Sequence, residues 1–318
     1  RCWYGNVMLP LSGTFPMAKI SGRTENEIVA DREALNQSLC LWASEALRDL
    51  PWRSTRDPWA VLVSEVMLQQ TQVSRVEPKY LEFVERWPSP QALTKSNISD
   101  LLKFWQGLGY PRRARNLYDS AHRIVQIHDC KVPSTLEDLL LLPGVGPYTA
   151  RAVLVFAFEL AVGVLDTNVG RLLARWSGRS LGPKEAQRIA DELVDPERPW
   201  LWNQGLFDLA ALRCSKRNPR CSGCPVEELC SWRGVGDDPA TGSAAVSTIQ
   251  APFQGSDRQA RGRLLKALTI GPVPAAQAAA IMELQDERAR ASRLIADLQS
   301  ESLITVRHEA LLLGDLLQ

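Results

Sequence analysis

Hydrophobic residues recur at intervals of three and four along the first two thirds of the chain, which is the spacing of amphipathic helices. The first run covers residues 33–50 and ends before Pro51. The same spacing predicts nine further helices, at 59–73, 78–86, 97–104, 112–127, 136–142, 147–160, 169–176, 183–194 and 200–212. Alternating β-branched positions are scarce, so the pattern up to residue 212 is all-α.

The two ends of the chain have a different character. Residues 1–32 mix Gly, Pro, Ser and charged side chains without periodicity, which predicts an irregular extension. Residues 234–256 are rich in Gly, Ala, Ser and Asp and are typical of a linker. Residues 257–318 then form a small unit with helical runs and short apolar stretches, at 257–268, 274–283, 287–299, 303–306 and 310–313. This order favours a winged-helix-like module.

The C-terminal module also carries a run of basic residues that allows two interpretations. Either these side chains meet phosphate, or they form a solvated helix face. They are Arg258, Arg261, Arg263 and Lys266.

A glycine hairpin joins two of the predicted helices. Ser134 and Glu137 have the spacing of a capping box before the first helix, and Pro147 suits the first turn of the second. Gly144 and Gly146 permit a sharp turn whose N–H groups can approach an anion at a helix N-terminus. The hairpin predicts either a helix-hairpin-helix that grips a nucleic-acid backbone or a plain turn in a helical bundle.

Composition narrows the class only a little. The chain has 318 residues, 45% hydrophobic and 23% charged, with a formal net charge of +1, which neither favours nor excludes nucleic acid. No run approaches the ~20 apolar residues of a membrane span. Pro10 interrupts the short apolar patch near the start, which does not fit a secretory signal. Seven cysteines, an odd number, are not typical of a secreted disulfide framework, so we expect a cytoplasmic protein.

Four of the cysteines have the spacing C-x6-C-x2-C-x5-C and could converge on one metal centre. They are Cys214, Cys221, Cys224 and Cys230. Structural zinc usually has two separated C-x2-C pairs, whereas this uneven spacing is typical of a [4Fe–4S] cluster. Zinc and four uncoordinated thiols are the alternatives. Basic residues in and after the loop indicate a DNA-facing surface rather than redox catalysis, and these are Lys216, Arg217, Arg220 and Arg233.

Taken together, these motifs resemble the endonuclease III superfamily of DNA glycosylases. The segments that carry the likeness are Leu-Pro-Gly-Val-Gly at 142–146, Leu-Asp-Thr-Asn-Val at 165–169 and the cysteine spacing. Four more segments resemble MutY-type adenine DNA glycosylases in particular, at 51–53, 64–73, 107–110 and 113–117. The resemblance covers about residues 33–233. It implies a six-helix lobe at 53–163 and an iron–sulfur cluster lobe built from 33–52 and 164–233.

The resemblance also implies catalytic roles. Tyr148 occupies the position of the Schiff-base lysine of bifunctional lyases, which implies a monofunctional enzyme. Glu65 would protonate the adenine, and burial should raise its pKa. Asp166, at a helix start, would stay ionised and stabilise or attack the cationic sugar. Tyr148 and Asn168 would support Asp166 and the attacking water. The alternatives are a solvated Glu65, a plain N-cap for Asp166 and a core aromatic for Tyr148.

A second group of residues would contact DNA. Gln70 and Tyr110 match residues that wedge into the base stack, with help from Leu108, while the adenine leaves the duplex. Pro111 departs from the family, which often has a second aromatic residue there. The full set expected to contact DNA is Gln70, Tyr110, Leu108, Arg53, Gly144 and Gly146.

The expected function is therefore hydrolysis of adenine from A:8-oxoguanine or A:G mispairs in double-stranded DNA, by a monomeric, nucleoid-associated protein. Residues 257–318 are too short and too helical for the Nudix-like domain with which many such enzymes read 8-oxoguanine. Thymine glycosylases of T:G mismatches also carry Tyr at the hairpin and lack that domain, which makes them the alternative enzyme. A cluster-bearing lesion sensor without catalysis is the alternative binding protein.

Overall fold

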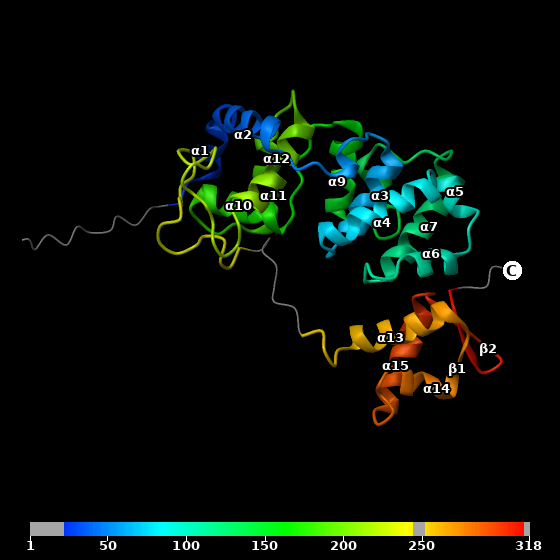
Figure 1. Ribbon diagram of the computed structural model, residues 1–318. Helices are drawn as coiled ribbons and strands as arrows, with labels where there is room; N and C mark the ends of the chain where they lie inside the picture. Colours follow the sequence, from blue (N-terminus) through cyan, green and yellow to red (C-terminus); the bar gives the residue numbers. More distant parts are fainter. Residues whose placement is uncertain (1–21, 244–251, 315–318) are drawn as a thin grey trace, which may run out of the picture.

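The computed structural model describes residues 22–243 and 252–314 of the chain. Within these residues the protein is almost entirely helical, as the spacing predicts, and its strands lie only near the C-terminus. Figure 1 shows the helices of residues 25–46 and 167–212 on one side, those of residues 58–158 on the other, and the C-terminal elements below them. The all-α expectation for residues up to 212 is confirmed.

Two hydrophobic cores divide the described residues. The first contains Trp59, Phe83 and Trp87. It lies among the short 3-10 helix η1 and seven α-helices, which are η1 (Pro51–Arg53), α3 (Pro58–Leu68), α4 (Val73–Arg86), α5 (Pro90–Thr94), α6 (Ile98–Phe104), α7 (Arg112–Ile127), α8 (Leu136–Leu140) and α9 (Pro147–Phe158). Edge-to-face aromatic pairs, such as Trp87 with Phe104 at 5.3 Å, fill its centre.

The second core joins the start of the described chain to a segment more than a hundred residues later. It contains Leu39, Leu172 and Trp202. Its helices are α1 (Glu25–Ala30), α2 (Arg32–Ala46), α10 (Thr167–Ser177), α11 (Pro183–Leu193) and α12 (Pro199–Leu212). Helix α2 packs along α12, which closes this core across the sequence gap.

The C-terminal module contains three helices and a small antiparallel sheet with strand order β1-β3-β2. The elements are α13 (Asp257–Ile270), β1 (Val273–Pro274), α14 (Ala275–Ile281), α15 (Arg288–Ser300), β2 (Ile304–Arg307) and β3 (Ala310–Leu313). Ile304 pairs with Leu313 and Val273 with Leu311. The expected helices and hairpin are present, and β1 is an addition; the winged-helix assignment stays a prediction.

Two boundaries differ from the pattern for local reasons. Residues 25–30 form α1 rather than irregular chain, because Thr24 and Glu27 make a capping box and Ile28 is buried; residues 1–21 lie outside the described part. Before α8 the cap is Thr135, not Ser134: its Oγ accepts the N–H of Asp138 at 3.2 Å. The helix starts one residue after an extended Thr135, which shifts the cap by one position.

Helices α3 and α4 meet at a break that the sequence pattern did not predict. Helix α3 ends at Leu68 and α4 starts at Val73, so the chain turns within the expected helix 59–73. Pro78 lies inside α4 rather than at its start. The buried side chains Val76 and Tyr80 lie on either side of the proline, and their burial compensates for the hydrogen bond that it cannot donate.

The first part of the expected linker is packed against the protein. Ala240 and Ser243 are buried, and the Ser243 Oγ accepts the N–H of Leu181 at 2.9 Å. The expected linker is therefore anchored at residues 240 and 243, while residues 234–237 are exposed, as expected of a linker. Residues 244–251 lie outside the described part of the chain.

Candidate active site

Helices α3 and α9 pack against each other and carry the first two site residues. Helix α3 starts at the N-cap Asp57, whose carboxylate accepts the N–H groups of Trp59 and Ala60 at 3.4 and 3.1 Å. Nearly every residue of α3 is buried, including Glu65, which is 5% exposed. Tyr148 lies in the first turn of α9, directly after the glycine hairpin. The fold thus places a carboxyl group and a phenol together at the protein interior.

The surroundings of Glu65 favour its neutral form. Burial raises the pKa of Glu65 to about 7; a hydrogen bond from Tyr148 acts in the opposite direction, and the nearby charge of Asp166 raises the pKa further. Its Oε2 atom has no hydrogen-bond partner among the described residues. The expected rise in pKa is confirmed, and a solvated surface position is wrong for this side chain.

Tyr148 belongs to the same electrostatic group. Burial raises the pKa of Tyr148 well above its usual value, and the charges of Glu65 and Asp166 raise it further. The phenol therefore keeps its proton and can donate a hydrogen bond. Its ring lies 6.5 Å from that of Phe207 on α12, so it also contacts the packed aromatic residues behind the site.

Asp166 is the N-cap of α10, and its carboxylate has several fixed donors. One oxygen accepts the N–H groups of Asn168 and Val169 at 2.8 and 2.7 Å, and the other accepts the Asn168 side-chain amide at 2.8 Å. Arg171 Nη1 in turn donates to the amide oxygen of Asn168 at 3.0 Å. These donors fix the orientation of the carboxylate at the helix N-terminus. Asp166 therefore caps α10 and is at the same time a candidate site residue.

The glycine hairpin needs its glycines for different reasons. Gly144 has φ +75°, and an added Cβ would lie 2.5 Å from the Asn116 side chain. Gly146 is the extended N-cap of α9 and has open space where a Cβ would be. The Ser120 hydroxyl donates to the Pro143 carbonyl at 2.8 Å and ties the hairpin to α7. This bond holds the hairpin against α7.

Two loops that carry the expected wedge residues lie next to each other. Gln70 and Tyr110 both have left-handed backbones, with φ 56° and 48°, which is uncommon for residues with a side chain. Residues 69–71 and 107–110 are joined by the Thr71 hydroxyl, which donates to the Leu108 carbonyl at 2.9 Å. We call these two segments the paired loops.

Arg113 holds the paired loops together, and no role for it was predicted. This side chain is 7% exposed. It donates to six oxygens at 2.6–2.9 Å, which are the carbonyls of Val66, Met67, Gln69, Leu108 and Gly109 and the hydroxyl of Thr71. Burial lowers the pKa of Arg113 to about 10. In the sequence, Arg113 stood out only as a basic residue within the segment 113–117 that resembles the family.

Two of the residues expected to contact DNA, Leu108 and Arg53, have side chains buried inside the protein. Leu108 is 4% exposed and lies in the first core, so in this structure its side chain does not reach the surface. The Arg53 side chain is 8% exposed and pairs with Asp208, with Nη1 and Oδ2 2.7 Å apart. It also donates to the Gln204 amide at 2.7 Å. The donors of Arg53 are thus used inside the protein, and its contact with DNA stays a prediction.

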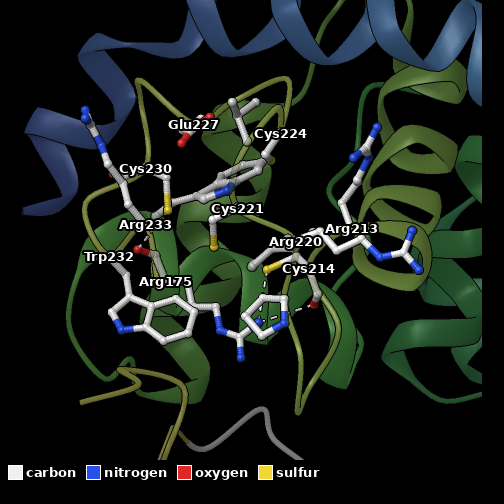
Figure 2. Close-up of a pocket in the computed structure, with 14 residues that line it drawn as sticks. Arg175, Arg213, Cys214, Arg220, Cys221, Cys224, Glu227, Cys230, Trp232 and Arg233 are labelled. Carbon is white, nitrogen blue, oxygen red and sulfur yellow. Dashed lines mark hydrogen bonds between the residues drawn. The ribbon is translucent and has the colours of Figure 1, made fainter. Parts of the chain in front are cut away.

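All four cysteines of the spaced motif line a single pocket (Figure 2). Gly234 has φ +79°, and a Cβ there would lie 3.1 Å from the Cys221 sulfur. Burial raises the pKa of Cys224 to about 11 and also raises that of Cys230, although nearby backbone N–H groups act in the opposite direction. The shared pocket and the close approach of Gly234 fit a group held by the four sulfurs. Among the described residues, no three or more His, Cys, Asp or Glu side chains surround a point that would hold a single metal ion.

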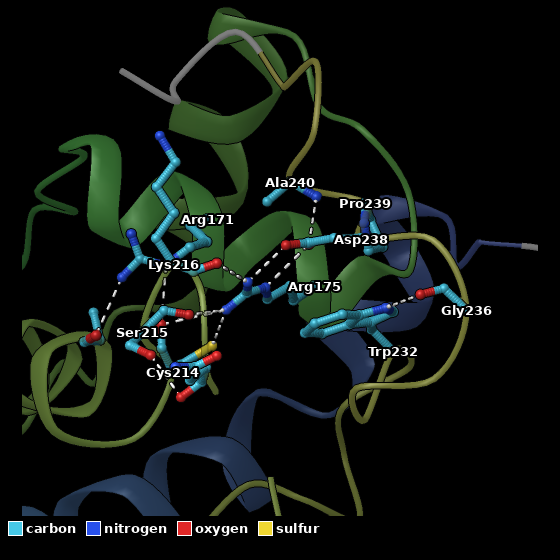
Figure 3. Close-up of polar contacts among 12 residues, drawn as sticks. Arg171, Arg175, Cys214, Ser215, Lys216, Trp232, Gly236, Asp238, Pro239 and Ala240 are labelled. Atoms are coloured by element: carbon cyan, nitrogen blue, oxygen red, sulfur yellow. Dashed lines mark hydrogen bonds and ion pairs between the residues drawn. The ribbon is translucent and has the colours of Figure 1, made fainter. Parts of the chain in front are cut away.

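Arg175 connects the cysteine loop to the packed segment that follows it (Figure 3). Its Nη1 donates to the Cys214 sulfur at 3.1 Å, and its Nη2 pairs with Asp238 at 2.6 Å. The guanidinium stacks on Trp232 at 4.5 Å and is almost fully buried. Asp238 lies in what the composition presents as linker, so no sequence signal pointed to it.

The structure thus brings together some expected residues and separates others. Glu65, Tyr148 and Asp166 influence one another electrostatically, and Asn168 is bonded to Asp166. Gln70 and Tyr110 lie on the paired loops, and the cysteines form a separate pocket. In the part of the chain that the structure describes, no helix has the length and apolar character needed to cross a membrane.

Comparison with known proteins agrees with this arrangement. Residues 63–196 match the HhH-GPD superfamily of base excision DNA repair proteins. An adenine DNA glycosylase of Mycobacterium tuberculosis is 38% identical over 88% of this chain and 93% of its own length. That share is larger than residues 1–256 could supply, so the likeness extends into the C-terminal module.

Solved structures give a similar result for the fold. A thermostable thymine-DNA glycosylase is 29% identical, with a TM-score of 0.62, over 64% of this chain and 97% of its own. A complex of endonuclease III with DNA has a TM-score of 0.57 at 21% identity, over 66% of this chain and 97% of that one. The chain belongs to the HhH-GPD superfamily of base excision DNA repair glycosylases and, within it, to the adenine DNA glycosylase family.

Proposed function

We propose that this protein hydrolyses the N-glycosidic bond of adenine mispaired with 8-oxoguanine or guanine and leaves an abasic site. The observation that carries the proposal is Glu65, a buried carboxyl group with a pKa near neutrality, an unpartnered oxygen and a carboxylate neighbour in Asp166. Proteins rarely bury such a group without a use for it. The adenine glycosylase relatives support adenine as the excised base.

Glu65 acts as the general acid. Adenine is a poor leaving group until its ring nitrogen N7 is protonated. A carboxyl group with a pKa of about 7 holds its proton at neutral pH and can still release it. The free Oε2 atom leaves one side of the carboxyl available to an extruded base.

Asp166 is the counter-charge to the sugar. As the glycosidic bond breaks, the sugar becomes cationic, and a fixed carboxylate stabilises it or bonds to it. The donors from Asn168 and Val169 keep the Asp166 carboxylate oriented. Glu65 and Asp166 thus divide acid and carboxylate roles through their different environments.

Tyr148 supports a monofunctional reaction. The phenol is neutral and cannot form an imine with the sugar, as a lysine at this position could. Its hydrogen bond to Glu65 orients the acid instead. We expect water rather than the protein to receive the sugar, with Asn168 beside the attacking water.

Cys214, Cys221, Cys224 and Cys230 would hold a [4Fe–4S] cluster. Their uneven spacing and their shared pocket support this ligand set. The cluster, when bound, would cross-link the loop at four points and need take no part in the bond cleavage.

Double-stranded DNA with A:8-oxoguanine or A:G mispairs is the proposed partner of a monomer in the cytoplasm, near the nucleoid. Gly144 and Gly146 would meet the backbone, while Gln70 and Tyr110 would enter the stack. The two hydrophobic cores support a division into a six-helix lobe at 53–163 and a cluster lobe at 33–52 and 164–233.

One observation favours a second candidate. The thymine-DNA glycosylase with the same fold is 29% identical to this chain, so T:G mismatches are the alternative substrate. Because thymine has no N7 to protonate, a buried acid such as Glu65 has less to do in that reaction.

Base release under single-turnover conditions tests both candidates. Matched duplexes carrying A:8-oxoguanine, A:G, T:G or A:T are incubated with protein and analysed with and without alkali. The proposal expects breaks at the two adenine mispairs only after alkali, and their loss in Glu65→Gln. Breaks at T:G would establish the alternative, and breaks without alkali would contradict the monofunctional assignment. Tight mispair binding without any release would indicate a sensor.

A further inference from the structure

The C-terminal module is docked against the helices of the first core rather than separate from them. Its buried apolar residues belong to the same core as α3 and α9. Arg115 on α7 donates to the Ser302 carbonyl at 3.1 Å, and Gly314 approaches Ile98 so closely that a Cβ would lie 2.8 Å away. Helix α13 also contacts α6. The module therefore has a fixed position beside the helices that precede and follow the second paired loop.

One contact of the module reaches the candidate wedge itself. Arg258, in the first turn of α13, donates from Nη1 to the Tyr110 hydroxyl at 3.3 Å. The Tyr110 backbone is already fixed, because Arg113 and the Trp105 indole donate to the Gly109 carbonyl at 2.9 and 3.1 Å. Arg258 thus adds a contact at the other end of the same residue.

The backbone that carries Arg258 is also held in place. The N-cap Ser256 accepts the N–H of Gln259 at 3.4 Å. The neighbouring Asp257 pairs with Arg290 and Arg293 of α15 at 2.7 and 2.9 Å. These contacts fix the backbone from which the Arg258 side chain extends, so that its guanidinium starts within reach of the Tyr110 hydroxyl.

We infer that Arg258 is a positioning residue for base extrusion, through which the C-terminal module sets the orientation of the Tyr110 ring. This inference rests on the proposed function. A side chain that enters the base stack must already be oriented, because otherwise its rotational freedom is lost at insertion. Arg258 removes that freedom in advance and links the module to the wedge.

The test compares Arg258→Met with Arg263→Met in the full-length protein. Both remove one positive charge from α13, but among the described residues the polar contacts of Arg263 are with Glu283 and Met282 of the module. The readouts are the fluorescence of 2-aminopurine at the target position, which reports unstacking without chemistry, and single-turnover release from A:G duplexes. Arg258→Met should lower both by about three- to tenfold, the size of one lost hydrogen bond, and Arg263→Met should change neither.

Tyr110→Phe provides an independent route, because it removes the hydroxyl without touching the module. It should reproduce the defect of Arg258→Met, and the double variant should be no worse than either single one. Equal behaviour of Arg258→Met and Arg263→Met, additive defects, or faster unstacking in Arg258→Met would each overturn the inference. Normal unstacking by the wild type without base release would instead refute the proposed function while leaving the fluorescence test valid.

Discussion

At the scale of single residues, burial of Glu65 links the stability of the protein to pH. Its pKa is about 7 in the folded state and about 4.5 when exposed. Between these values the folded protein holds a proton that the unfolded chain has released, so stability decreases as pH rises through this window. The proton held by Glu65 is also the one proposed to reach the adenine. The burial of this side chain therefore determines both its strength as an acid and the pH dependence of protein stability.

Glu65→Gln should remove this pH dependence. The free energy of unfolding of the wild type should fall, relative to the variant, by up to about 3 kcal/mol between pH 4.5 and pH 7. Urea unfolding at several pH values measures both proteins. The wild-type rate of base release should also decline above pH 7, where the acid loses its proton. Parallel stability curves for the two proteins would contradict the assigned pKa.

At the scale of elements, the hairpin between α8 and α9 depends on one glycine more than on the other. Gly144→Ala should destabilise the protein by about 2–3 kcal/mol, because alanine is strained at φ +75° and would meet Asn116. Gly146→Ala should cost less than about 1 kcal/mol, since a Cβ there has open space. Thermal unfolding of the two variants measures this difference in stability, and their affinity for mispaired DNA shows whether the hairpin still binds. Equal losses would show that the hairpin tolerates a left-handed alanine.

Helix bounds were predicted best from the sequence where a single helix has a regular apolar stripe along its whole length. The residues of α7 and α6 follow a regular apolar stripe, and their predicted bounds agree within a residue. The start of α4 was missed because Pro78 was taken for a helix start. Helix α1 was missed because it buries only Ile28, too little to give a periodic signal.

For the site, sequence was sufficient where a motif carries the chemistry and insufficient where partners are distant. The local motifs led to Glu65, Asp166 and the cysteines. The ion pair of Arg53 with Asp208 was not predicted, because the two residues are 155 positions apart and spacing cannot reveal such a pair. Arg113 was overlooked because its acceptors are mostly backbone carbonyls, which every sequence contains.

At the scale of the whole molecule, a buried ion pair lies where the chain crosses from one core to the other. Asp208 on α12 is fully buried and accepts bonds from Arg48 and Arg53 at 2.6–2.9 Å. Burial raises the pKa of Asp208, but its bonds to the two arginines more than offset this, and the net pKa is lowered. The segment between α2 and α3 is thereby fastened to α12.

Asp208→Asn should destabilise the protein by about 3–5 kcal/mol, because two arginines lose the charge that compensates for their partial burial. Asp49→Asn is the matched control, since Asp49 is exposed in the same crossing segment and should change stability by less than about 0.5 kcal/mol. Chemical unfolding measures both. A loss confined to the control, or absent from both, would exclude a structural role for this ion pair.

The pairing of α2 with α12 has a consequence for the order of assembly during translation. The end of α2, Ala46, leaves the ribosome long before Pro199 is added, and at 5–20 residues per second the delay is roughly ten to thirty seconds. Throughout that interval α2 lacks α12, the helix along which it packs most extensively, whereas the helices from α3 to α9 are contiguous and can collapse together. We therefore expect the helices from α3 to α9 to fold first during translation, and α2 to take its final place only after α12 has been made.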